Sequence, residues 1–167
     1  RGIIKEMPKS AQGECWSVFW PVVEAVGMAK SLGYVPSGVF PSAKRLTPKE
    51  SFHASLDEKP DSFVSDLIDA VLTQSIKFAY QGVIDYNDQI YMPALFGGTF
   101  PKFPLVLADE VQDFNPVNHA LLDKLVKGRL GAVGDPWQSI YAFRGAKQGG
   151  MAELATKFKA KQCNLSV

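Results

Sequence analysis

Acidic side chains follow one short apolar segment of this 167-residue sequence, and an acid and an amide follow another. Asp109 and Glu110 come directly after the apolar run 103–108, and the segment GDPWQ (134–138) follows the run 130–133. Two adjacent carboxylates can divide the work of phosphate-ester hydrolysis: one binds hydrated Mg²⁺, and the other accepts a proton from the attacking water. The glutamine that ends the second segment could then contact a phosphate oxygen or orient that water.

Strands and helices that alternate along the chain would position these residues. The runs 103–108 and 130–133 are short and apolar on both sides, which is typical of buried parallel strands. Residues 116–127 repeat apolar positions with helical spacing, and a helix over 149–159 and a strand over 162–167 are predicted to follow. This order predicts right-handed crossovers and a parallel α/β sheet. In such sheets ligands bind outside the carboxyl ends of the strands, where both polar segments would lie.

The first part of the chain predicts helices instead. Residues 14–32 predict one helix or a broken pair, with Pro21 as a kink and Gly33 as the stop. Residues 34–60 predict a proline-rich loop that contains brief helices, such as one over 48–52. A helix is predicted over 63–81, with Asp61 or Ser62 as its cap and Gly82 as its end. Another helix is predicted over 85–96, broken or started at Pro93, and a linker over 97–102 follows it.

Composition limits the classes of protein. Eighteen basic and seventeen acidic residues give a formal charge of +1, so any nucleic-acid contact must be local. Cys15 and Cys163 are far apart in the sequence and fit no metal-binding spacing, so we expect two reduced cysteines. Reduced cysteines are typical of a soluble, cytoplasmic protein. No apolar stretch is long enough for a membrane span. The sequence starts on Arg1 and ends on residues 164–167, which look like a strand about to continue, so we expect a piece of a longer chain.

Each feature also has a simpler interpretation. Acidic residues after a strand often cap the next helix, as Asp113 or Asn115 would do before Pro116.

The segment QSIYAFRGA (138–146) interleaves two aromatic residues with an arginine, which suits stacking of single-stranded bases beside a cation for phosphate. Packing of that loop onto the sheet is the alternative.

Two segments resemble a known family. LADEVQDFNP (107–116) and VGDPWQSIYAFRGA (133–146) are similar to the second and third signature motifs of UvrD/Rep-type superfamily 1 DNA helicases. The resemblance implies that Asp109 binds Mg²⁺, that Glu110 is the general base, and that Gln138 contacts the γ-phosphate of ATP. It also places Asp135 at the nucleotide site.

The same resemblance implies a DNA site. Tyr141, Phe143 and Arg144 match positions that contact single-stranded DNA or lie beside its groove, although Phe143 could instead pack beneath Arg144. Gln112 and Asp113 complete the second motif and would support the coupling between nucleotide and DNA. Trp137 stands where the family has a small or polar residue, and we expect no effect on the chemistry.

The segment IDYNDQIYMPALF (84–96) also resembles the family, which implies that Tyr86, Asp88 and Gln89 lie near the DNA groove. By this resemblance residues 1–84 form a mainly helical 1B-like subdomain. Residues 85–167 form part of the first RecA-like domain, a P-loop NTPase fold, without the strand that carries the phosphate loop.

The expected function is therefore that of a fragment of an ATP-dependent DNA helicase or translocase. Its cofactors would be ATP and Mg²⁺, and its partners would be single-stranded DNA or a duplex/single-strand junction and the remainder of the helicase, including the second RecA-like domain. The motif G-x-x-x-x-G-K-[ST] does not occur, so the isolated chain should be inactive. The alternatives are a non-catalytic DNA-binding or protein-interaction remnant of a helicase, and an unrelated phosphohydrolase with Asp109 and Asp135 as metal ligands.

Overall fold

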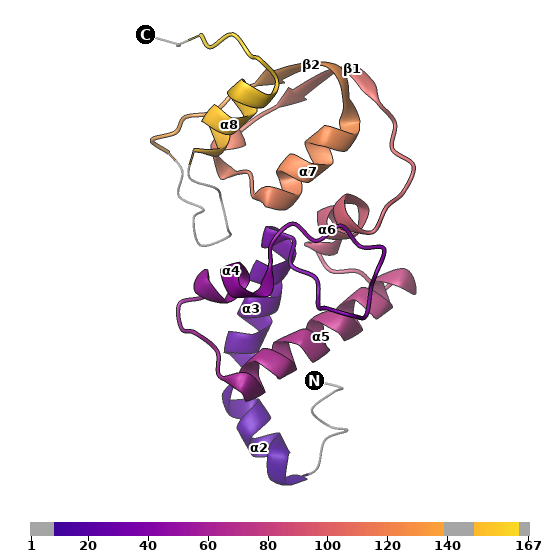
Figure 1. The fold of residues 1–167 in the computed structure, drawn as a ribbon, viewed down its shortest axis with the longest axis vertical. Helices are drawn as coiled ribbons and strands as arrows, with labels where there is room; N and C mark the ends of the chain where they lie inside the picture. Colours follow the sequence, from indigo (N-terminus) through magenta and orange to yellow (C-terminus); the bar gives the residue numbers. More distant parts are fainter. Residues whose placement is uncertain (1–8, 139–148, 164–167) are drawn as a thin grey trace.

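The computed structural model describes residues 9–138 and 149–163, which form a helical half and a smaller sheet half (Figure 1). The helical half covers residues 9–95, and the sheet half covers residues 103–157. The mixed helix and strand content, with one parallel strand pair, confirms the α/β expectation at this coarse level. Across the described residues, no helix is both long and apolar enough to cross a membrane.

The first predicted helix is a broken pair. Helix α2 spans Lys9–Ser17 and α3 spans Phe19–Leu32, so the break comes before Pro21 rather than at it. Proline clashes with the carbonyl four residues earlier, which belongs to Ser17, whereas its missing N–H costs nothing in the first turn of α3. Gly33 ends α3 with a left-handed φ of 73°, as predicted.

Three further helices complete the helical half. They are α4 (Lys49–Ala54), α5 (Ser62–Tyr80) and α6 (Asp88–Leu95). Asp61 caps α5 by accepting a hydrogen bond from the Val64 N–H at 2.8 Å, as predicted. The prediction that α6 would break or start at Pro93 was wrong, because the helix continues through it.

Packing accounts for the continuity of α6. Tyr91, Ala94 and Leu95 are buried in the core of the helical half. Tertiary packing of an apolar face contributes more to a short helix than the single backbone hydrogen bond that a proline removes. The Pro93 carbonyl also accepts a hydrogen bond from Lys124 Nζ at 2.8 Å.

Most of the apolar stripe predicted for α5 faces the core. Leu67, Ile68, Leu72 and Ile76 are buried against α3 and α6, whereas Phe78, at the C-terminal end, is 44% exposed.

The sheet half contains two parallel strands. β1 spans Phe103–Ala108 and β2 spans Val126–Ala132, and Val106 pairs with Leu130 in their register. Helix α7 (Pro116–Leu125) crosses between them and continues into β2 without a loop. Asn115 caps α7 by accepting hydrogen bonds from the backbone N–H groups of the next turn, so the capping alternative holds for this residue.

The expectation of buried strands was wrong. On β1, Phe103, Leu105 and Leu107 are 44%, 55% and 78% exposed, because α7 and helix α8 (Gly150–Lys157) cover only the opposite face, where Ala108 is buried. The predicted third strand is also missing where it can be checked: Gln162 and Cys163 have no regular structure, and residues 164–167 lie outside the described part.

Helix α7 joins the two halves. Its residues Val117 and Ala120 belong to the core of the helical half, whereas Leu122 belongs to the core of the sheet half. Helix α7 is therefore packed against α6 and α3, although residues 97–102 between the halves are irregular as predicted.

Candidate functional site

The loops after β1 and β2 lie side by side. The parallel pairing extends past both strands, because the Val133 N–H donates to the Ala108 carbonyl at 2.9 Å and the Val111 N–H donates to the Val133 carbonyl at 3.1 Å. These two bonds bring Asp109 and Glu110 to the same edge of the sheet as the segment 134–138. The expected meeting of the two polar segments is therefore present.

Glu110 has an unusual backbone conformation. Its φ and ψ are 52° and 40°, in the left-handed region that costs a non-glycine residue about 1–3 kcal/mol. Asp109 Oδ1 accepts a hydrogen bond from the Glu110 N–H at 2.9 Å, and a short 3-10 helix over Val111–Asp113 follows. Burial of Val111, which is 1% exposed, anchors the turn. The turn leaves both carboxylates exposed at the strand end.

Gln112 connects the two loops. Its side-chain Nε2 donates to Glu110 Oε2 at 2.6 Å, and its Oε1 accepts from the Asp135 N–H at 3.1 Å. The Gln112 residue is only 6% exposed, so its end of each bond is buried. Gly134 makes room for the amide, because a Cβ at that position would lie 2.3 Å from Gln112 Oε1.

Asp135 shapes the second loop. Its Oδ1 accepts from the Trp137 N–H at 2.9 Å, and its Oδ2 accepts from Gln138 Nε2, also at 2.9 Å. Hydrogen bonds therefore run without interruption from Glu110 through Gln112 and Asp135 to Gln138. Both oxygens of Asp135 are used inside its own turn, which favours a role in shaping the loop over a role as a metal ligand.

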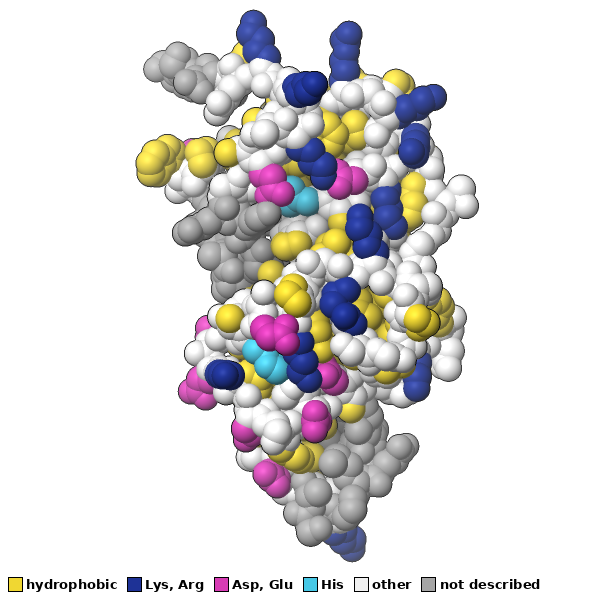
Figure 2. Space-filling model, in the orientation of Figure 1, with side chains coloured by type: hydrophobic (Ala, Val, Ile, Leu, Met, Phe, Trp, Pro, Cys, Tyr) yellow, Lys and Arg dark blue, Asp and Glu magenta, His cyan; other side chains and the backbone are white. Residues whose placement is uncertain are grey.

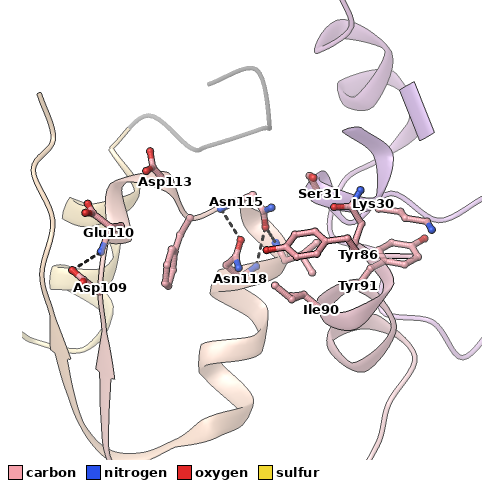
Figure 3. Close-up of a pocket in the computed structure, with 13 residues that line it drawn as sticks. Lys30, Ser31, Tyr86, Ile90, Tyr91, Asp109, Glu110, Asp113, Asn115 and Asn118 are labelled. Carbon is pink, nitrogen blue, oxygen red and sulfur yellow. Dashed lines mark hydrogen bonds between the residues drawn. The ribbon is translucent and has the colours of Figure 1, made fainter. Parts of the chain in front are cut away.

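A cavity of about 300 Å³ lies beside the loop that follows β1, between the two halves (Figure 3). One wall carries Asp109, Glu110 and Asp113, and the facing wall carries Lys30 and Tyr86. The other lining residues are Ser31, Asn87, Ile90, Tyr91, Phe114, Asn115, Val117 and Asn118. Asp113 Oδ1 is buried, and among the described residues it has no hydrogen-bond partner.

The expected DNA residues divide into two groups. Tyr86 is 79% exposed in the turn before α6, so its ring is accessible. Asp88 is only 2% exposed and pairs with Lys30, so it acts inside the protein. Tyr141, Phe143 and Arg144 lie outside the described residues.

Two residues of interest were missed from the sequence. Trp137, which was expected to be neutral, is 92% exposed beside Gln138, and an aromatic residue in place of a small or polar one was the available signal. Lys30 is 1% exposed, and the signal was a lysine in the apolar stripe of α3 that also contains Val26 and Ala29.

The charge on the sheet half is not uniform. Figure 2 shows lysine and arginine side chains over the sheet half on the face drawn, with few acidic side chains between them. Among the described residues, the exposed basic residues of this half and its flanking segments are Lys102, Lys127, Arg129, Lys157, Lys159 and Lys161. Exposed acidic residues occur in the same half at Asp109, Glu110, Asp123 and Glu153, so the basic character belongs to the face shown and not to the whole half.

Within the described part of the chain, no group of three or more His, Cys, Asp or Glu side chains could hold a metal ion by itself. Mg²⁺ that binds together with a nucleotide needs only one or two carboxylates, because phosphate oxygens and water complete its shell. The exposed carboxylates at the end of β1 fit that kind of site.

Comparison with known proteins gives the family. Residues 69–159, more than half of the chain, match the model of the UvrD/REP helicase N-terminal domain, and the chain belongs to this family. The matched region includes α6, both strands and both site loops.

Relatives are longer proteins. RecB of the RecBCD enzyme from Mycolicibacterium smegmatis is 46% identical over 61 residues, which cover 35% of this chain and 5% of that protein. RecB from Buchnera aphidicola is 43% identical over 63 residues, or 36% of this chain and 5% of that protein. The ATP-dependent DNA helicase Rep of Salmonella typhimurium is 34% identical over 90 residues, which cover 48% of this chain and 13% of Rep. The chain thus matches only a small part of each relative, and no solved structure matches it.

Proposed function

We propose that this chain is part of an ATP-dependent DNA helicase or translocase, in which ATP hydrolysis drives movement along single-stranded DNA. Membership of the helicase family and the name of the Rep relative support the class. The observation that carries the proposal is the hydrogen-bond path from Glu110 through Gln112 and Asp135 to Gln138, because it links a candidate base to a candidate phosphate contact.

In this proposal residues 85–167 contribute part of a RecA-like domain and residues 1–84 a 1B-like subdomain. The face of β1 that carries Phe103, Leu105 and Leu107 is exposed, which supports the RecA-like assignment of residues 85–167. An apolar strand face of this kind is normally covered when a parallel sheet is complete. Further strands and helices of the complete protein would cover it.

Asp109 would hold Mg²⁺, which when bound neutralises charge on the nucleotide phosphates. Glu110 would accept a proton from the attacking water, and its carboxylate is oriented for this by the Gln112 amide. Gln138 would contact the γ-phosphate. Its side chain is held by Asp135, so a movement of Gln138 on loss of phosphate would be transmitted to the loop that it begins.

That loop contains Tyr141, Phe143 and Arg144, which we propose as the contact with single-stranded DNA. Tyr86, from the other side of the cavity, would add an aromatic surface, since bases stack on exposed rings. The basic residues of the sheet half would bind phosphates.

The test is ATP hydrolysis by the complete protein that carries this chain, with and without single-stranded DNA. The proposal expects DNA-stimulated turnover in the complete protein and none in the isolated 167-residue chain, which lacks the phosphate loop motif. DNA binding by the complete protein without ATP turnover would favour the non-catalytic alternative. Turnover that DNA does not change would favour a phosphohydrolase unrelated to DNA.

A further inference from the structure

Lys30 is a buried lysine that contacts one serine and two aspartates. Its side chain is 0% exposed. Its Nζ donates to Ser75 Oγ at 2.8 Å and to Asp85 Oδ2 at 2.6 Å, and it forms an ion pair with Asp88 Oδ1 at 2.7 Å. Two of the three N–H donors of the ammonium group thus have hydrogen-bond acceptors, and the charge lies beside Asp88 Oδ1, a buried atom that accepts no hydrogen bond from the described residues. The lysine thereby ties α3 to α5 and to the turn that precedes α6.

The two aspartates also hold each other. The Asp85 N–H donates to Asp88 Oδ2 at 3.0 Å, and the Asp88 N–H donates to Asp85 Oδ1 at 2.9 Å. Each carboxylate thus gives one oxygen to the backbone of the turn and the other to Lys30. Hydrogen bonds from Lys30 and from the backbone hold the pKa of Asp85 below its usual value, although burial acts in the opposite direction.

Tyr86 and Asn87 are the two residues enclosed by this reciprocal pair. Tyr86 is 79% exposed, so little packing fixes the start of its side chain and the backbone of the turn sets its direction. Both residues line the cavity, and Figure 3 shows Tyr86 across it from the loop that carries Asp109, Glu110 and Asp113. The charged network therefore holds the backbone from which the Tyr86 ring projects.

Stability alone is a poor reason for such a network. Replacement of a buried ion pair by apolar residues of similar volume is often neutral or stabilising, whereas charges with matched partners can fix one particular geometry. The neighbouring positions Val26 and Ala29 of α3 are apolar and buried, so an apolar residue at position 30 would continue the same stripe.

We propose that Lys30 is a positioning residue, which locks the turn 85–88 so that Tyr86 stands at the mouth of the cavity and receives a base of single-stranded DNA. This inference rests on the proposed helicase function, and it assigns to the helical half a defined part in DNA engagement. Lys30 itself touches neither DNA nor nucleotide.

The experiment measures DNA-stimulated ATP hydrolysis by the complete protein as a function of single-stranded DNA concentration. Lys30→Met removes the charge at similar length, and Asp85→Asn weakens the same network at a half-exposed position that the fold tolerates better. We expect both variants to raise the DNA concentration for half-maximal stimulation at least about fivefold, the lower end of the effect of one stacked base. The turnover at saturating DNA should change little. In a Tyr86→Ala background, neither substitution should weaken DNA binding further.

Lys49→Met is the matched control, because it breaks the 2.8 Å Lys49–Asp69 ion pair of the same half without touching the turn 85–88. Its DNA dependence should equal that of the unaltered protein. If Asp85→Asn, and any Lys30→Met protein that folds, show the DNA dependence of the unaltered protein, the positioning role is overturned. DNA-stimulated ATP turnover by the unaltered protein would still support the proposed helicase function in that case. Effects that add to those of Tyr86→Ala would also overturn the positioning role. Absence of DNA-stimulated turnover in the unaltered protein would overturn both proposals.

Discussion

Gly134→Ala should disconnect the two site loops. The new Cβ would lie 2.3 Å from Gln112 Oε1 and 3.2 Å from both Val111 Cγ2 and the Val111 backbone nitrogen. The Gln112 amide must therefore move, with loss of its bonds to Glu110 and to the Asp135 N–H. Gly134 is not at a positive φ, so the effect comes from contact and not from backbone strain.

The magnitude follows from two contributions. Loss of hydrogen bonds by a buried polar side chain costs about 1–3 kcal/mol, and an extra carbon in a packed site costs about 1–3 kcal/mol. We expect a decrease of roughly 2–4 kcal/mol in the free energy of unfolding, because the two contributions overlap. For a chain of this size, that corresponds to a decrease of roughly 4–16 °C in Tm.

Thermal and urea unfolding of the isolated chain measure the effect. Gly13→Ala is the matched control, since its Cβ meets nothing within 4 Å and lies in α2, where alanine should stabilise by about 0.5–1 kcal/mol. The decisive test is the Gln112→Ala background, in which Gly134→Ala should cost clearly less, because only the two 3.2 Å contacts with Val111 remain. Fully additive costs in the double variant would show that the contact with Gln112 is not the cause.

Two further predictions concern the elements around the site. Asn115→Ala should lower the free energy of unfolding by about 1 kcal/mol in urea titrations, because it removes the side chain that accepts hydrogen bonds from the Val117 and Asn118 N–H groups. Asn115→Asp should retain most of this stability, because aspartate can accept the same bonds. An equal loss in both variants would contradict the capping role. The pKa of Asp85 is lowered in the folded state, so its contribution is present above the ordinary value of 3.8 and is lost as the pH falls through the lower folded value. The stability difference between the unaltered chain and Asp85→Asn, measured by urea unfolding, should therefore be seen at neutral pH and shrink below pH 3.8, and a difference that does not depend on pH would contradict the assignment.

Local signals in the sequence predicted much of the fold correctly. Asp61, Gly33 and the apolar spacing of α5 act within a few residues, so both predicted ends of α5 and the predicted end of α3 agree with the structure to within one position. The starts of the first helical stretch and of α6, which have no such local signal, differ by five and three positions. The strand at 103–108 was also predicted, because its apolar run is short and is followed by polar residues. Its exposure could not be predicted, since burial depends on neighbouring strands and not on the run itself.

In the site, too, the residues with a local signal in the sequence were predicted, and the contacts between distant segments were not. Asp109, Glu110 and Gln138 stand out by type and by their place after apolar runs, and the structure brings their loops together. The left-handed conformation of Glu110 and the link through Gln112 depend on contacts between segments more than 20 residues apart, as in the bond from the Asp135 N–H. Lys30 was missed for this reason too, because its partners at 75, 85 and 88 lie far away in the sequence.

We propose Glu110 as the general base of an ATP-driven helicase. The most direct measurement is single-turnover ATP hydrolysis by the complete protein with saturating single-stranded DNA, for Glu110→Gln beside Glu153→Gln on α8 as the matched control. We expect Glu110→Gln to bind nucleotide and DNA but to hydrolyse ATP about 10²-fold or more slowly, with Glu153→Gln unaffected. Hydrolysis by Glu110→Gln within a few-fold of the unaltered protein would contradict the assignment.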